Sequence, residues 1–181
     1  MRIINGRYKN RRFSIPKNLK IRPTTDKAKE SLFNILENMV NFNEIKTLDL
    51  FSGSGNISYE FFSRGSTVTS VDSNIKCIKF ISDVSKNYGM DFSIIKKDVF
   101  NYLNSSKLKF DIVFADPPYN MPKNNYCKLI KLIFEKNIIS NNGIIVIEHS
   151  SFLNFEKHEK FFKSKKYGDV NFSFLINKIW K

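Results

Sequence analysis

The chain has 181 residues, a formal net charge of +13, 41% hydrophobic residues and 26% charged residues, a composition typical of a globular protein. That length fits a single domain with its own core. No apolar run could cross a membrane, the first residues lack the apolar stretch of a signal peptide, and two cysteines are too few for a disulfide framework. We therefore expect a monomeric, cytoplasmic protein with reduced thiols, no membrane contact and no metal.

The positive charge is concentrated at the N-terminus. Residues 1–30 carry ten Lys and Arg against two acidic residues, whereas residues 31–150 carry thirteen against twelve. Five of the six arginines fall in the first 22 residues, and Arg presents a planar fork of donors that suits phosphates and base edges. A basic end on a nearly neutral body is typical of nucleic-acid-binding proteins. The candidate contacts are Arg2, Arg7, Lys9, Arg11 and Arg12.

The first residues predict a small β-hairpin. Two short apolar and basic runs, 2–5 and 11–15, are separated by an Asn-Gly pair that favours a tight reversal. We therefore expect a basic hairpin extension over residues 1–22 and a core over residues 23–181.

From residue 24 onward, the pattern alternates between helices and strands. Thr24 or Thr25 caps the first helix, and apolar residues at helical spacing predict helices over 26–41, 56–63, 74–88, 99–103 and 125–134. Apolar β-rich runs predict strands over 47–51, 67–71, 92–95, 111–115 and 143–147. This alternation implies an α/β fold with a parallel sheet covered on both faces. No helix separates the last two strands, 160–165 and 170–176, so we expect them to close the sheet as an antiparallel pair.

The first strand of the sheet runs into a glycine-containing turn. Gly53 and Gly55 allow a sharp reversal and a close approach of a ligand, at a strand end where open α/β sheets bind their ligands. The dinucleotide fingerprint requires a third glycine at position 58, where Ser58 stands instead. This departure argues against a nicotinamide cofactor.

Acidic residues stand near the ends of three successive predicted strands. Asp49 can hold an ammonium group, Asp72 stands where an acid binds ribose hydroxyls, and Asp98 can accept a hydrogen bond from an adenine amine. S-adenosylmethionine carries all three groups and no phosphate. We therefore predict that this cofactor is bound by Asp49, Phe51, Gly53, Gly55, Asp72, Ser73, Asp98 and Val99.

The fourth parallel strand leads into Asp116-Pro117-Pro118-Tyr119. The prolines stiffen this loop and keep Asp116 extended at the strand tip. An exocyclic amine on a base must pyramidalise before it attacks a methyl sulfonium, and hydrogen bonds to the Asp116 carboxylate and the Pro117 carbonyl favour that geometry. Tyr119 can stack on the base. The predicted catalytic residues are therefore Asp116, Pro117 and Tyr119.

These motifs resemble those of a known family. Asp-Pro-Pro-Tyr is the signature of S-adenosylmethionine-dependent amino methyltransferases, and the chain resembles the bacterial 16S ribosomal RNA guanine-N2 methyltransferases of the RsmD type. The similarity covers residues 1–12, 22–36, 49–56, 60–65 and 116–119. It implies a Rossmann-like class I methyltransferase fold with seven strands, and methyl transfer to one guanine of the small-subunit RNA. It also implies that Arg22 and Thr24 lie near the site mouth, among the RNA-binding residues.

The chain departs mildly from the family pattern at Ser52, Ser58 and Asp72, where Ala, Gly and Glu are common. Two other functions stay open. One is a DNA adenine-N6 methyltransferase, which the core motifs alone do not exclude, although the chain is short for a sequence-reading domain. The other is an RNA-binding assembly factor without catalysis, which the intact Asp116 and Tyr119 argue against.

Overall fold

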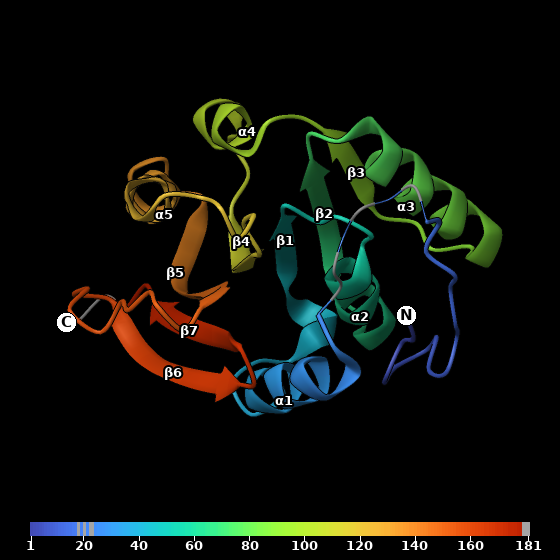
Figure 1. The fold of residues 1–181 in the computed structure, drawn as a ribbon, viewed down its shortest axis with the longest axis horizontal. Coiled ribbons are helices and arrows are strands. Elements are labelled where there is room, and N and C mark those ends of the chain that lie inside the picture. Colours follow the sequence, from blue (N-terminus) through green and yellow to red (C-terminus); the bar gives the residue numbers. More distant parts are fainter. Residues whose placement is uncertain (18, 20, 22–23, 179–181) are drawn as a thin grey trace.

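The computed structural model describes residues 1–17, 19, 21 and 24–178, which form one seven-stranded sheet between two layers of helices (Figure 1). The strands are β1 (Lys46–Leu50), β2 (Thr67–Asp72), β3 (Ser93–Lys96), β4 (Phe110–Ala115), β5 (Ile139–Ser150), β6 (Phe161–Tyr167) and β7 (Val170–Ile176). Their order is β3-β2-β1-β4-β5-β7-β6. β1 to β5 pair in parallel, and β7 runs antiparallel between β5 and β6. The predicted mostly parallel sheet with an antiparallel closing pair is confirmed.

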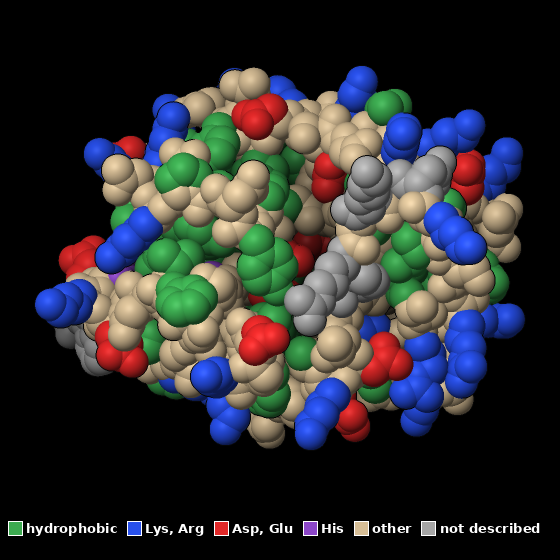
Figure 2. Space-filling model, in the orientation of Figure 1, with side chains coloured by type: hydrophobic (Ala, Val, Ile, Leu, Met, Phe, Trp, Pro, Cys, Tyr) green, Lys and Arg blue, Asp and Glu red, His purple; other side chains and the backbone are tan. Residues whose placement is uncertain are grey.

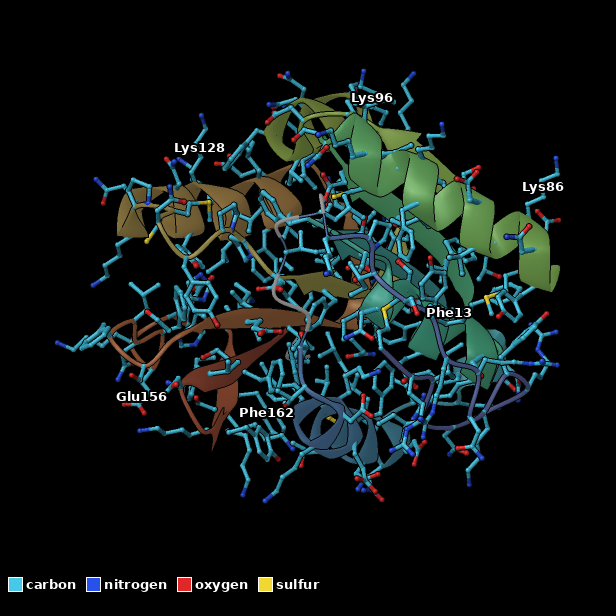
Figure 3. The ribbon with its side chains drawn as sticks, turned by 45° about the vertical axis from the view of Figure 1, so that its right-hand side comes forward. Phe13, Lys86, Lys96, Lys128, Glu156 and Phe162 are labelled. Atoms are coloured by element: carbon cyan, nitrogen blue, oxygen red, sulfur yellow. The ribbon has the colours of Figure 1, made fainter. Side chains whose placement is uncertain are left out.

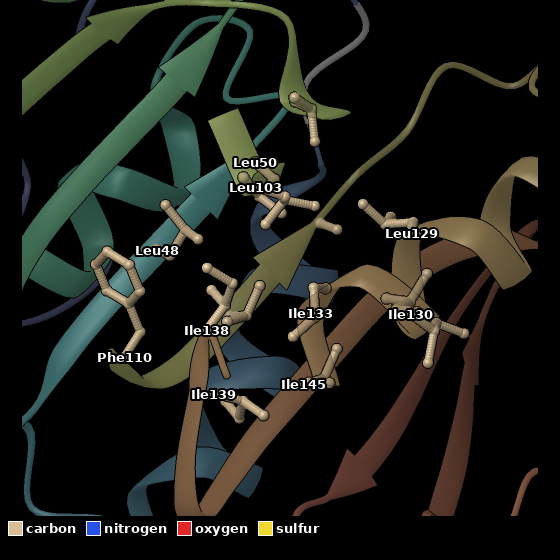
Figure 4. Packing of buried hydrophobic residues seen from close by; sticks show 14 of the residues in the cluster. Leu48, Leu50, Leu103, Phe110, Leu129, Ile130, Ile133, Ile138, Ile139 and Ile145 are labelled. Atoms are coloured by element: carbon tan, nitrogen blue, oxygen red, sulfur yellow. The ribbon is translucent and has the colours of Figure 1, made fainter. Parts of the chain in front are cut away.

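The helices are α1 (Asp26–Glu37), the short 3-10 helix η1 (Phe42–Glu44), α2 (Asn56–Arg64), α3 (Ile75–Tyr88), α4 (Val99–Ser105) and α5 (Lys123–Glu135). Apolar residues of α4 and α5 pack on one face of the sheet, and those of α1 and α2 pack on the other, with α3 beside α2. Figure 4 shows the first layer, where Leu48 of β1, Leu103 of α4 and Ile133 of α5 point toward one another. Successive side chains of a strand point to opposite faces of the sheet, so the central strands pack against both layers of helices.

Polar side chains and glycines set the helix ends. The Thr25 hydroxyl accepts a hydrogen bond from the backbone N–H of Ala28, and the Asn74 side chain caps α3 in the same way. Gly65 and Gly89 end α2 and α3 in the left-handed conformation.

Two predicted boundaries are wrong. α1 ends at Glu37 instead of near Asn41, because the side chain of Asn41 caps the following η1 helix. β5 begins at Ile139, although the sequence predicted a start at Gly143. Its first part pairs with Phe110 before a register shift, so the polar residues that suggested a loop lie within an irregular strand.

The predicted N-terminal hairpin is not confirmed. Residues 1–17, which we call the N-terminal arm, reverse direction as predicted but make only one isolated antiparallel bridge, between Arg2 and Arg12. Ile3 and Phe13 are buried against Tyr59 of α2 and Ile81 of α3. Figure 3 shows Phe13 on the arm where it passes α2 and α3. The two halves of the arm exchange backbone hydrogen bonds between Met1 and Phe13 and between Ile3 and Arg11, and packing on two helices also holds the arm in place.

Candidate active site

A cleft of about 500 Å³ opens at the carboxyl ends of β1, β2 and β4. Figure 2 shows a hollow at the centre of the molecule with acidic side chains inside it. Parallel strands end at one edge of a sheet, so residues from distant motifs meet there. The predicted site residues that line this cleft are Thr24, Asp49, Phe51, Gly53, Asp72, Ser73, Asp116, Pro117 and Tyr119.

The glycine turn is shaped by backbone conformation and by one carboxylate. Phe51, Gly53 and Gly55 all have positive φ angles, of 59°, 52° and 75°. A side chain at Gly55 would place a Cβ 2.9 Å from the ring of Tyr59, so this position accepts only glycine without local rearrangement. No such obstacle stands near Gly53, where the nearest atoms are 3.9 Å away, so the open space beside it is available to a ligand.

Asp72 holds the glycine turn against the end of β2. One carboxylate oxygen accepts a hydrogen bond of 2.8 Å from the backbone N–H of Gly53, and the other accepts one of 2.7 Å from that of Asn74. A carboxylate has about four acceptor positions, so two such bonds leave capacity for the hydroxyls of a ribose. Asp72 therefore shapes the turn and also faces the cleft.

Asp49 is a buried carboxylate that lines the cleft beside α2. Its side chain accepts a hydrogen bond of 2.5 Å from the hydroxyl of Ser58. The pKa of Asp49 is raised from 3.8 to about 7, mainly by burial and also by the charges of Asp72 and Glu148, while the hydrogen bonds of Ser58 oppose this rise. Ser58, which the sequence showed only as a departure from the glycine pattern, is thus a direct partner of Asp49.

Asp98 and Val99 are not part of this cleft. The carboxylate of Asp98 accepts a hydrogen bond of 3.0 Å from the backbone N–H of Asn101 and so caps α4, while Val99 is 2% exposed and belongs to the core. Their predicted contact with the adenine stays a prediction. The physical reason for the placement is local, because an Asp directly before a helix satisfies free amides there.

Asp116 stands at the tip of β4, next to the glycine turn. Its backbone N–H donates a hydrogen bond of 3.3 Å to the carbonyl of Leu50, which ties the proline loop to β1. Burial, followed by the negative charges of Glu148 and Asp49, raises the pKa of Asp116 well above its usual value. Pro117 is buried and Tyr119 is 57% exposed at the rim of the cleft.

Glu148 is a site residue that the sequence did not single out. Ala115 of β4 and Ile147 of β5 are register partners. The residues that come next, Asp116 and Glu148, therefore lie at neighbouring positions across the two strands. Glu148 is 5% exposed and its side chain accepts a hydrogen bond of 2.8 Å from the hydroxyl of Thr24. Burial raises the pKa of Glu148 to about 7, whereas the Thr24 hydrogen bond lowers it. We call Asp49, Asp116 and Glu148 the acidic floor.

The predicted RNA-binding residues of the arm differ from one another in how far their charges are paired within the protein. Arg7, Lys9, Arg11 and Arg12 are exposed, and Figure 2 shows basic side chains on the side of the molecule where Figure 1 places the arm. The guanidinium of Arg7 lies 4.9 Å from the ring centroid of Phe62. Arg2 pairs with Asp26 at 3.2 Å, so part of its charge is neutralised within the protein.

The two other predicted RNA contacts differ from the arm. Thr24 is buried and uses its hydroxyl on Glu148, so it belongs to the wall of the cleft. Arg22 lies outside the described residues.

A buried polar network fixes the arm to the core, and the sequence did not reveal it. The ammonium of Lys29 contacts Glu60 at 3.0 Å and also donates to the Arg2 carbonyl and the Asn56 side chain. Glu60 accepts a further hydrogen bond from the Ile4 backbone N–H and pairs with Arg64. The available signal was the position of Lys29 on the apolar face of α1, at helical spacing from Leu32, Phe33 and Leu36.

The segment 60–65 of the family resemblance continues this anchoring. Ser63 accepts hydrogen bonds from the backbone N–H groups of Arg7 and Tyr8 through its carbonyl and its hydroxyl, respectively. A Cβ on Gly6 would lie 2.0 Å from the Ser63 carbonyl oxygen, so the arm approaches α2 as closely as a glycine allows. This segment therefore holds the arm in place, and Asn56 extends the contact to the cleft by donating to the Thr24 carbonyl.

The described ranges contain no group of three or more His, Cys, Asp or Glu side chains that could hold a metal ion. Within the same ranges, no helix combines the length and apolar character needed to cross a bilayer.

Comparisons with known proteins identify the family of the chain. Residues 1–176 match the protein family described as Conserved hypothetical protein 95. The chain is 32% identical to ribosomal RNA small subunit methyltransferase D of Buchnera aphidicola, over 85% of this chain and 78% of that protein. It is 30% identical to an uncharacterized methylase of Rickettsia prowazekii, over 93% and 94% of the two chains.

Among solved structures, a hypothetical protein of Thermus thermophilus has the same fold, with a TM-score of 0.85, 20% identity and coverage of 97% of this chain and 98% of that chain. The family match spans nearly all of the sequence, including both motifs of the cleft. The chain therefore belongs to the Conserved hypothetical protein 95 family, the RsmD-like S-adenosylmethionine-dependent methyltransferases.

Proposed function

We propose that this protein transfers a methyl group from S-adenosylmethionine to the exocyclic N2 amine of one guanine in 16S ribosomal RNA. The observation that carries the proposal is the shared cleft, where Asp49 and the glycine turn lie on one side and Asp116 and Tyr119 on the other. The similarity to a ribosomal RNA small subunit methyltransferase supports the RNA substrate.

The described residues fit the proposed cofactor. Asp49 is a buried carboxylate with no cationic partner among the described residues, so an ammonium group would supply the charge that its surroundings lack. Asp72 offers acceptor positions for hydroxyls, and the space beside Gly53 allows a ligand to approach the backbone. The cofactor, when bound, supplies an electrophilic methyl group on a sulfonium.

The proline loop provides the groups that act on the amine. The Asp116 carboxylate and the Pro117 carbonyl accept hydrogen bonds from its two N–H groups, which draws the nitrogen lone pair out of conjugation with the ring. Tyr119 stacks on the base and sets its plane. Asp116 has a raised pKa, so its ionised form is a base strong enough to take the proton that the methylated amine must lose. Orientation supplies much of the remaining rate enhancement.

The N-terminal arm provides the docking surface for the RNA. Its exposed arginines and Lys9 attract phosphates, and the cleft lies at the strand ends, where a base enters only after unstacking. We therefore place the target guanine in a loop or bulge rather than in a continuous helix.

The test uses small ribosomal subunits from cells that lack the gene, incubated with the purified protein and S-adenosylmethionine carrying a labelled methyl group. We expect mass spectrometry to find the label in one N2-methylguanine of 16S RNA, at a position that is unmethylated in these cells and methylated in cells with the gene.

Two outcomes would contradict the proposal. Label in DNA adenine but not in the subunit would favour a DNA adenine-N6 methyltransferase. Tight binding to the subunit without transfer of label to any nucleic acid would favour a non-catalytic assembly factor.

A further inference from the structure

A second cleft of about 520 Å³ lies next to the cofactor cleft. It is bounded by the start of α1, the turn between β6 and β7, and the proline loop. Thr24 and Tyr119 line both clefts, so the two spaces meet at these side chains. Glu148 lines the second cleft. A base stacked on Tyr119 would therefore have Asp116 on one side and Glu148 on the other.

Glu148 is held in one orientation by a residue of the α1 entry. The Thr24 hydroxyl donates to the Oε2 atom of Glu148 at 2.8 Å, and both side chains are buried. The Oε1 atom of Glu148 receives no hydrogen bond and no ion pair from any side chain or backbone group that the structure describes. This oxygen is not among the fully buried atoms without a partner, so it is open to the second cleft, where it can accept a hydrogen bond from a ligand.

Two carboxylates at neighbouring strand positions offer acceptors for the two donors of guanine. Asp116 and Glu148 follow register partners on neighbouring strands, so their carboxylates repel each other across a short gap. The Watson–Crick edge of guanine carries donors on two adjacent nitrogens, N1 and N2. Adenine has an acceptor at N1, so the ionised form of Glu148, which only accepts hydrogen bonds, would face adenine lone pair to lone pair.

We propose that Glu148 selects guanine by accepting a hydrogen bond from N1–H of the base whose N2 amine is held by Asp116. This inference rests on the proposed function and deepens it by assigning the group that distinguishes guanine from other purines. Thr24 is then a positioning residue, because it orients the carboxylate that reads the base. A site that hydrogen-bonds a substrate N–H discriminates against analogues lacking it, since its own polar group is left unpaired.

The experiment compares three RNA fragments that differ only at the methylated position, which carries guanine, 2-aminopurine or adenine. 2-Aminopurine has the reacting amine at C2, but its N1 is an acceptor. We expect the wild-type protein to methylate guanine about a hundredfold faster than 2-aminopurine under single-turnover conditions, as suits one lost hydrogen bond to a charged group. Adenine should receive no label.

The variant Glu148→Gln changes the reading group with little change in shape. Its amide oxygen takes the Thr24 hydrogen bond and its NH2 group faces the base, so it donates to N1 of 2-aminopurine and opposes N1–H of guanine. We expect the guanine preference to fall by about tenfold or more. Thr24→Val should also lower the preference for guanine over 2-aminopurine, but by less. This variant tests the same inference if Glu148→Gln does not fold. Calorimetric titration with S-adenosylmethionine reports whether each variant is folded.

Glu156→Gln is the matched control, since Glu156 is exposed in the loop after β5 and is labelled in Figure 3 far from the arm. It should keep the wild-type preference. Equal methylation of guanine and 2-aminopurine by the wild type, or an unchanged preference in both folded variants, overturns the role of Glu148 and leaves the proposed function intact. Absence of label with every RNA and with the small subunit overturns the proposed function, and this inference with it.

Discussion

The N-terminal arm and the acidic floor are opposite in both charge and exposure. The arm presents exposed arginines on a segment that packs on α2 and α3, whereas the floor contains two buried carboxylates, Asp49 and Glu148, and the half-buried Asp116. Exposed cations attract phosphate, and buried carboxylates repel it. Under the proposed function, the protein therefore separates recognition of a polyanion from the chemistry on an amine: a nucleic acid would dock on the arm, and only a base with N–H donors would enter the floor.

The largest expected effect comes from removing the reacting carboxylate of the floor. Asp116→Ala should lower the single-turnover rate of methyl transfer by about 10²–10⁴-fold, because the amine loses its acceptor and its base. Filter binding and calorimetry should show nearly unchanged affinity for RNA and S-adenosylmethionine, since the arm and the glycine turn are untouched. A rate within a few-fold of wild type would refute the assigned role.

Breaking the buried network around Lys29 and Glu60 should lower the free energy of unfolding. Lys29→Met leaves the buried Glu60 without one of its cationic partners, and breaking a buried pair typically costs about 3–5 kcal/mol. Urea denaturation measures this change in the free energy of unfolding. Lys27→Met is the matched control, because Lys27 is exposed on the same helix and its loss should change stability by less than about 0.5 kcal/mol. Equal effects of the two substitutions would contradict the network.

The floor should make the stability of the cofactor-free protein depend on pH. The folded-state pKa of Asp49 is raised from 3.8 to about 7, so the folded protein binds more protons than the unfolded chain between these values. This contribution is fully present below about pH 4 and is lost as the pH rises through about 7. Thermal unfolding across this window should show the loss, and Asp49→Asn should reduce it while Glu148 retains its own share with the same sign. An identical pH profile in the variant would show that Asp49 ionises freely.

Substitutions in the arm should change the rate of methyl transfer least, but they should measurably change the salt dependence of RNA binding. Replacing Arg7, Arg11 and Arg12 with Gln should lower the slope of log affinity against log salt for RNA by about three, or about one per lost phosphate contact. The matched control replaces three exposed lysines in the segments before β4 and β5, namely Lys107, Lys109 and Lys136. An equal loss in both triple variants would mean that net charge, and not the arm, drives RNA binding.

Much of the site followed from strand ends and local motifs. Asp49, Gly53, Asp72 and Asp116 meet in one cleft because each lies at or just after the carboxyl end of a parallel strand, and those ends share an edge. Asp98 shows the limit of this reasoning. It too follows a strand, but it immediately precedes α4, and capping that helix takes its side chain.

The residues that were missed depend on partners distant in sequence. Lys29 is buried because α2 brings Glu60 and Asn56 to it, and nothing near Lys29 in the chain announces those partners. Glu148 lies near the end of β5. It becomes a site residue because the fold places it beside Asp116 at the tip of β4 and within hydrogen-bond distance of Thr24, which precedes α1. The predicted hairpin is not confirmed as a strand pair: the two halves of the arm share backbone hydrogen bonds, but the arm also pairs with Ser63 of α2, which lies far away in the sequence.

The amino-acid sequence alone determined the order of helices and strands, the parallel sheet, the glycine turn and the proline loop, because periodicity, glycine and proline act through local backbone geometry. Only the tertiary structure decided which charges are buried, which carboxylates lie together and what anchors the arm. Desolvation and pairing depend on groups that the fold gathers from distant parts of the chain, and these determine the proton affinities of the acidic floor.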